Sequence, residues 1–198
     1  FLFNASGSTD NTLSEMQRAK KHYKNITIVN FKVNKGKREG MAEGFKRAKG
    51  EIVIQLDSDS FTEPEALKRI VMPFVDKNIA AVVGHTEPSN KDENFLTKMQ
   101  TPYYFMSFRA LKASESIFNM VFCCSGCFSA YRKSYVLPII EEWRKETFLG
   151  KVITFGDDRA LTNQMLRLGY KAVYCFDAKA CTVVPNTFNQ FFKQQVRW

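Results

Sequence analysis

Short apolar runs and longer segments of helical periodicity follow one another along this chain. The apolar runs predict strands at residues 1–3, 26–31, 51–56, 79–84 and 171–176. Apolar residues three and four positions apart predict helices at 12–23, 39–49, 65–75, 135–148, 157–168 and 187–198. Thr62 and Glu65 are spaced as in a capping box, which predicts the start of the third helix. The alternation predicts an α/β fold with a mostly parallel, doubly wound sheet, whose ligands bind beyond the carboxyl ends of the strands.

Two segments have aromatic and other apolar side chains but no clear place in a soluble core. Residues 94–120 are mostly helical by pattern, and residues 188–198 form the last predicted helix. Neither contains the ~18–20 consecutive apolar residues that a membrane-spanning helix needs. We therefore expect amphipathic helices at 94–120 and 188–198 that lie on a lipid bilayer.

The charge and the cysteine content of the chain favour some classes of function and exclude others. The chain has 198 residues, with 29 Lys and Arg against 20 Asp and Glu, which gives a net charge of +9. This excess favours an anionic partner: a nucleotide phosphate, an acidic membrane surface or nucleic acid. No base-reading motif accompanies the charge, so we expect no nucleic-acid partner. Five cysteines, two of them adjacent, argue against a disulfide scaffold.

Asp57 and Asp59 directly follow a predicted strand. Two carboxylates one residue apart at the mouth of a sheet can share Mg²⁺ or Mn²⁺, which borrow further oxygen ligands from phosphates and water. The structural alternative is a polar turn, because Asp and Ser favour turns. The place of the pair at a strand end favours the metal interpretation.

Asp157 and Asp158 follow Gly156 at the start of a predicted helix. One carboxylate there satisfies free N–H groups and the helix dipole. The second exceeds what capping requires, and a general base that deprotonates a sugar hydroxyl would be such a carboxylate. The positive helix end is expected to lower its pKa.

Lys35-Gly36-Lys37-Arg38 lies between a predicted strand and a predicted helix. Taken alone, it is typical of a solvated basic turn. The alternative is a diphosphate clamp, which agrees with the positive net charge.

Five motifs occur in one order along the chain. They are Gly36-Lys37-Arg38-Glu39, Asp57-Ser58-Asp59, Ser125-Gly126 before Tyr131-Arg132, Gly156-Asp157-Asp158-Arg159, and Gln194-Gln195-Val196-Arg197-Trp198. Together they resemble the processive family 2 glycosyltransferases, most of all the hyaluronan synthase and chitin-oligosaccharide synthase branch. The resemblance covers residues 26–198.

The resemblance implies a GT-A nucleotide-sugar fold and an inverting transfer from a UDP-sugar, carrying GlcNAc or GlcA, to a growing β-linked glycan. It implies donor contacts by Lys37, Arg38, Asp57, Gln194 and Arg197, and a metal ion on Asp57 and Asp59. It also implies that Asp158 is the base and that Ser125, Gly126 and Trp198 contact the acceptor.

The chain also departs from the family pattern. Members carry an Asp near the first Gly-Ser turn, where this chain reads Asn4-Ala5-Ser6-Gly7-Ser8-Thr9-Asp10, and Asp10 is too late in the turn to take that role. The chain opens on a strand-like segment without Met. We expect residues 1–198 to be one catalytic domain, truncated at both ends, from an enzyme on the cytoplasmic face of the plasma membrane. The alternative is an impaired module that binds nucleotide-sugars or membranes.

Overall fold

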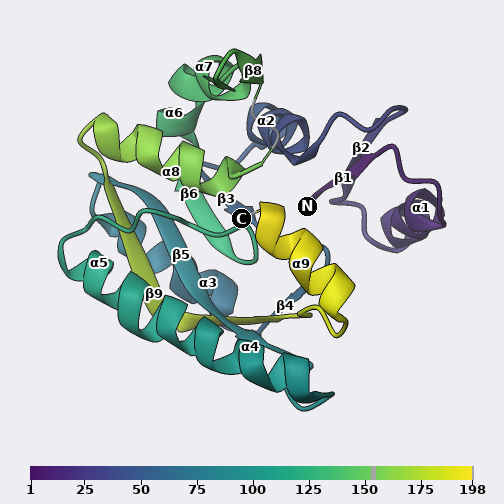
Figure 1. Cartoon of the computed structure of the whole chain (residues 1–198). Helices are drawn as coiled ribbons and strands as arrows, with labels where there is room; N and C mark the ends of the chain where they lie inside the picture. The colour runs from purple at the N-terminus through teal and green to yellow at the C-terminus, as the bar shows by residue number, and fades with distance from the viewer. Residues whose placement is uncertain (153–154, 198) are drawn as a thin grey trace.

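The computed structural model describes residues 1–152 and 155–197, which form a sheet with helices on both faces (Figure 1). Five strands form the central sheet in the order β3-β6-β5-β9-β4. Their bounds are Ile52–Gln55 (β3), Ser129–Arg132 (β6), Ile79–Pro88 (β5), Lys171–Thr182 (β9) and Ser60–Thr62 (β4). Two further pairs are Leu2–Ser6 (β1) with Thr27–Phe31 (β2), and Thr147–Phe148 (β7) with Lys151–Val152 (β8).

Strand directions in the central sheet are mixed. β5 and β9 are parallel, whereas β6 runs antiparallel to both β3 and β5, and β4 antiparallel to β9. The α/β class is confirmed, but the mostly parallel arrangement predicted above is wrong for this sheet. The two strands responsible, β4 and β6, have three and four residues, and tertiary pairing with their neighbours sets their direction, which a hydrophobic pattern does not show.

With one exception, the helices agree with the predicted positions to within a few residues; the helix predicted at 135–148 is divided and gives way to β7 at residues 147–148. The helices are Thr12–His22 (α1), Lys37–Arg47 (α2), Ala66–Val71 (α3), Phe95–Phe105 (α4), Ala113–Ile117 (α5), Lys133–Val136 (α6), Ile140–Arg144 (α7), Asp157–Arg167 (α8) and Phe188–Arg197 (α9). Short 3₁₀ segments follow at Met72–Val75 (η1) and Leu137–Ile139 (η3), and a π-helical segment joins α4 to α5 at Met106–Lys112 (η2).

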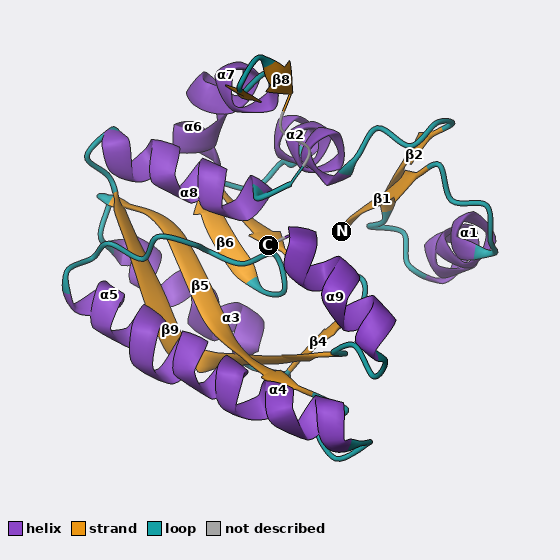
Figure 2. Cartoon of the chain, in the orientation of Figure 1, coloured by secondary structure: helices purple, strands orange, loops and turns teal. Residues whose placement is uncertain are grey.

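Helices lie on both faces of the sheet (Figure 2), and the buried side chains form two apolar cores. On one face, α3 packs Ala66 and Ile70 against Val82 of β5 and Ala130 of β6. On the other face, a larger core joins side chains of α2, α7 and α8 to β5 and β6; it includes Met41, Phe45, Trp143, Leu161, Met165, Val83 and Tyr131. The starts of α2 and α8 are thereby brought to the same side of the sheet.

The predicted capping box at Thr62 is wrong. Thr62 ends β4, and the N-cap residue of α3 is Glu65, whose side chain makes no capping hydrogen bond. A capping box does occur at α4, where Asn94 accepts a hydrogen bond from the Thr97 amide and the Asn94 amide donates to the Thr97 hydroxyl.

The segment from α4 through η2 to α5 is helical, as predicted, and exposes many large apolar side chains. They are Phe95, Met99, Tyr103, Phe105, Met106, Leu111 and Ile117, followed by Phe118, Met120 and Phe122. On α9, Phe188, Phe192 and Val196 are exposed four residues apart, on one helix face. In the described part of the chain, no helix has the length and apolar character to cross a membrane.

Candidate active site

Three charged side chains from distant parts of the sequence meet at one edge of the sheet. Lys37 lies at the start of α2, Asp57 follows β3, and Asp158 lies in the first turn of α8. The Lys37 ammonium is 2.9 Å from Asp57 Oδ1 and 3.6 Å from Asp158 Oδ2. This places one cation between two carboxylates.

Asp158 is held by donors on both of its oxygens. Gln55 Nε2 donates to Oδ1 at 3.1 Å, and the Gly126 amide donates to Oδ2 at 2.8 Å. The backbone is fixed as well, because the Thr162 hydroxyl donates to the Asp158 carbonyl at 2.7 Å and accepts from the Cys124 amide at 3.1 Å. The carboxylate therefore has a defined orientation.

Burial raises the pKa of Asp158, and this effect outweighs the opposing influence of Lys37. The expectation that the helix end lowers this pKa is therefore wrong, because the loss of water around the carboxylate dominates. For Lys37, burial alone would lower the pKa, but the carboxylates of Asp158 and Asp57 raise it overall, so the ammonium stays charged. A buried carboxylate with a raised pKa is a stronger base than an exposed one.

Gly126 packs closely against the side-chain ends of this cluster. A Cβ atom at this position would lie 2.7 Å from Gln55 Nε2 and 2.9 Å from Asp158 Oδ2, and would collide with the Lys37 ammonium. The glycine thus lets the loop before β6 bring its amide against Asp158.

Arg38 does not join the cluster, although its neighbour Lys37 does. It is 5% exposed, its Nε donates to Asp157 Oδ1 at 2.7 Å, and its Nη1 donates to the Trp143 carbonyl at 2.8 Å. The guanidinium also lies over the Trp143 ring, 5.2 Å from its centroid. The nucleotide-facing role expected for Arg38 is therefore replaced by a structural one, a buried ion pair that joins α2, α7 and α8.

Asp57 and Asp59 flank a tight turn, in which the Ser60 amide donates to the Asp57 carbonyl at 3.0 Å. Asp57 is half-buried and Asp59 is exposed. Among the described residues, no group of three or more His, Cys, Asp or Glu side chains is arranged to hold a metal ion. Mg²⁺ and Mn²⁺ bound with a nucleotide need only one or two protein carboxylates, so this pair fits such an ion.

The remaining predicted residues are only partly described. Gln194 is half-buried on α9 and makes no side-chain hydrogen bond within the described residues. Trp198 and the side chain of Arg197 lie outside the described residues. Ser125 lies in the loop before β6, next to Gly126, and its buried hydroxyl has no partner in the part of the chain that is described.

Gln55 is a member of the cluster that the sequence analysis missed. The signal was present, because Gln55 is the polar residue at the end of the otherwise apolar strand Ile52-Val53-Ile54. Strand alternation places it on the same face as Val53, which packs against the core of α2 and α8.

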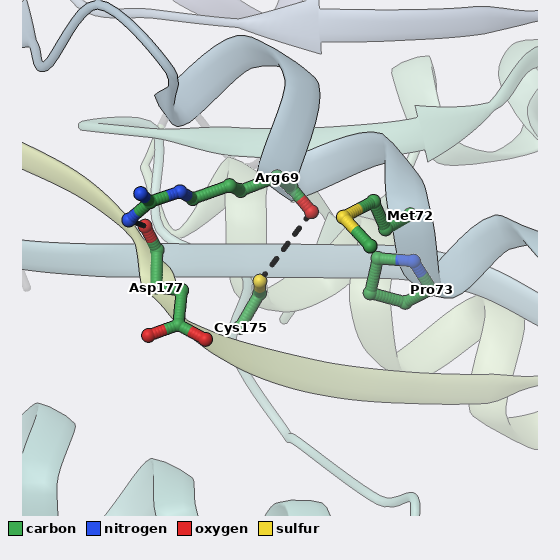
Figure 3. Close-up of a pocket in the computed structure, with 5 residues that line it drawn as sticks. All are labelled: Arg69, Met72, Pro73, Cys175 and Asp177. Carbon is green, nitrogen blue, oxygen red and sulfur yellow. Dashed lines mark hydrogen bonds between the residues drawn. The ribbon is translucent and has the colours of Figure 1, made fainter.

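A recess of about 480 Å³ lies elsewhere, lined by Arg69, Met72, Pro73, Cys175 and Asp177 (Figure 3). The Cys175 thiol donates to the Arg69 carbonyl at 3.5 Å, and Arg69 Nη1 donates to the Asp177 carbonyl at 3.0 Å. Burial raises the pKa of Cys175, which keeps it a thiol. This recess contains none of the cluster residues and no activated nucleophile.

Comparison with known families shows the family of this chain. A family model described as chitin synthase matches residues 6–198. The chain belongs to the chitin synthase family. Two relatives are a hyaluronan synthase of Streptococcus pyogenes, 35% identical over 88% of this chain and 42% of the relative, and an N-acetylglucosaminyltransferase of Mesorhizobium japonicum, 33% identical over 87% and 41%. This chitin synthase family chain thus spans about two fifths of the length of these relatives.

A structural comparison confirms the GT-A fold of this chitin synthase family member. A mannosyltransferase from Pyrobaculum calidifontis, solved in complex with GDP-Man and Mn²⁺, matches the whole chain and 55% of its own length with a TM-score of 0.67. The two sequences are 21% identical, so the likeness concerns the fold.

Proposed function

We propose that this chain transfers a sugar, GlcNAc or GlcA, from a UDP-sugar to the growing end of a β-linked polysaccharide of the hyaluronan or chitin type. The observation that carries the proposal is the convergence of Lys37, Asp57 and Asp158 at one edge of a GT-A sheet. Membership of the chitin synthase family and relatives named for hyaluronan and N-acetylglucosamine transfer support it.

Asp158 acts as the general base in this proposal. Its carboxylate takes the proton from an acceptor hydroxyl, whose oxygen attacks the anomeric carbon of the donor on the face opposite UDP. The bond from that carbon to the UDP oxygen breaks, and UDP leaves with the electron pair. One displacement of this kind inverts the anomeric configuration and needs no covalent enzyme intermediate.

Asp57 and Asp59 hold a divalent metal ion in this proposal. When bound, Mn²⁺ or Mg²⁺ offsets negative charge on the leaving diphosphate. Lys37 adds a fixed positive charge beside Asp57, and we propose that it contacts the donor phosphates. Gln194 and Arg197 on α9 complete the donor side, while Ser125, Gly126 and Trp198 face the acceptor.

The metal requirement tests the donor half of the proposal. In the full-length parent protein, we expect UDP binding and UDP release from UDP-GlcNAc to require Mn²⁺ or Mg²⁺, because the diphosphate otherwise meets the carboxylates of Asp57 and Asp59 with only the Lys37 ammonium to offset their charge. Calorimetry of UDP with Mn²⁺ and with EDTA measures this. Asp59→Asn should remove the dependence, whereas the matched change Asp10→Asn, at an exposed aspartate outside the cluster, should preserve it. Equal UDP affinity in EDTA and Mn²⁺ would show that the carboxylate pair holds no metal.

We also propose that the exposed apolar side chains of α4–α5 and α9 rest on the cytoplasmic face of the plasma membrane. Isolated chain 1–198 should then bind lipid vesicles in co-sedimentation, because apolar area leaves water. Replacing Phe188 and Phe192 together with Glu should weaken binding, and Met72→Glu, at a similarly exposed apolar residue on η1, should not. A detergent-free monomer without vesicle binding would contradict this placement.

A further inference from the structure

In the Gln55 side chain, the amide nitrogen makes a hydrogen bond and the amide oxygen makes none within the described residues. Its Nε2 donates to Asp158 Oδ1 at 3.1 Å. Its Oε1 is buried and has no hydrogen-bond partner among the described residues. An ionised carboxylate accepts and cannot donate, so the nitrogen end must face Asp158 and the oxygen end must point elsewhere.

A buried amide oxygen without a partner is costly, at about 1–3 kcal/mol. A second buried polar atom without a partner lies next to the cluster in sequence, since the Ser125 hydroxyl oxygen is also buried and unpartnered within the described residues. Ser125 precedes Gly126, whose amide donates to the other oxygen of Asp158. The two buried oxygens without hydrogen-bond partners thus come from the same two chain segments, β3 and the loop before β6, that orient the Asp158 carboxylate. This arrangement indicates a ligand with its own hydrogen-bond donors.

We propose that Gln55 is a positioning residue for Asp158 and that its free carbonyl oxygen accepts a hydrogen bond from the acceptor sugar. This inference rests on the proposed function and extends it to the acceptor. A sugar with two neighbouring donor groups meets both requirements. One hydroxyl gives its proton to Asp158 as it attacks, and the adjacent hydroxyl or amide N–H donates to Gln55 Oε1.

Two replacements of Gln55 separate its hydrogen bond to Asp158 from its proposed hydrogen bond with the acceptor sugar. Gln55→Met keeps the length of the side chain and removes both the donor and the acceptor. Gln55→Glu keeps an acceptor oxygen but loses the N–H that Asp158 accepts. Gln164→Met is the matched control, because Gln164 on α8 also has a buried, unpartnered Oε1 and makes no side-chain hydrogen bond to the cluster among the described residues.

The experiment measures transfer in the full-length parent protein with varied glycan acceptor, together with UDP affinity and melting temperature. We expect Gln55→Met to lower kcat by about 10- to 100-fold, the range of one misplaced catalytic group, and to raise the acceptor KM. We expect Gln55→Glu to lower kcat with a smaller change in acceptor KM. UDP affinity should stay near wild type in both variants, and Gln164→Met should match wild type in kcat and KM.

The outcomes distinguish this inference from the proposed function. If the parent protein transfers no sugar, the proposed function fails. If the parent is active and Asp158→Asn is not, but Gln55→Met behaves like Gln164→Met, the inference alone is wrong. An unchanged acceptor KM in Gln55→Met would show that water fills the carbonyl site and would overturn the acceptor contact.

Discussion

We expect Asp158→Asn to lower sugar transfer by at least about 10²-fold, since loss of a general base typically costs about 10²- to 10⁴-fold in rate. Asparagine keeps the shape of the side chain but cannot take the hydroxyl proton. UDP-sugar affinity should stay near wild type, because the change affects the transition state more than the bound donor. Steady-state transfer by the full-length parent, with calorimetry of UDP, measures both.

The pH dependence of sugar transfer is a second test of Asp158 as the general base. The base acts only when ionised, so transfer falls as the pH drops through the pKa of Asp158. Burial raises that pKa above its usual value of 3.8, so the decline begins at higher pH than for an exposed aspartate. If Asp158→Asn keeps most of its transfer rate while Asp157→Asn loses it, the base is Asp157.

Asp157→Asn should instead unfold the protein more easily. Arg38 and Asp157 are 5% and 6% exposed, and the change removes the nearer of the two carboxylates that pair with the buried guanidinium, leaving only Glu146 Oε2 at 3.4 Å. Breaking a buried pair from one side typically costs about 3–5 kcal/mol in the free energy of unfolding. A urea titration followed by tryptophan fluorescence measures the loss.

The double replacement Arg38→Met with Asp157→Leu is the control for this ion pair. It removes both charges and keeps apolar volume, so it should recover much of the stability that Asp157→Asn loses. A single variant Asp157→Asn with the wild-type urea midpoint would contradict the structural role assigned to this pair.

Long periodic segments were predictable from the sequence, because many residues contribute to each pattern. Helices at 12–23 and 157–168 were placed to within one residue of α1 and α8 at both ends. β4 has three residues and β7 and β8 have two each, so no period can be read from them. Thr62 fits a capping box by spacing, but tertiary pairing of β4 with β9 decides its conformation.

The residues of the candidate site were also predictable only in part. Strand ends and motif order indicated Asp57 and Asp158, and the structure brings both to Lys37. The sequence could not show which of Lys37 and Arg38 faces the cluster. Adjacent helical residues point about 100° apart, and packing against Trp143 selects the direction. Gln55 was missed because one polar residue in a short strand carries no pattern of its own.

The long strand β9 contains three extra residues, 176–178, that have no partners on β5, and we call this irregularity the step. It limits how the sequences of related chains can diverge. β5 runs directly from Gly84 to His85, while the paired residues of β9 jump from Cys175 to Lys179. Past this step, β9 pairs with β4, and the Val183 amide donates to the Asp59 carbonyl at 3.3 Å.

Deleting one residue from 176–178 would move the later half of β9 by one position. Ala180, which packs in the core of α3, would then exchange faces with its neighbours, and the Asp59 turn would lose its register. Within the step, Ala178 is fully buried in the core of α3 and the Phe176 ring lies against the Arg109 guanidinium, so both are constrained in identity as well. Related chains should therefore vary first in the amino acid at Asp177, which is exposed, and last in the number of residues at 176–178.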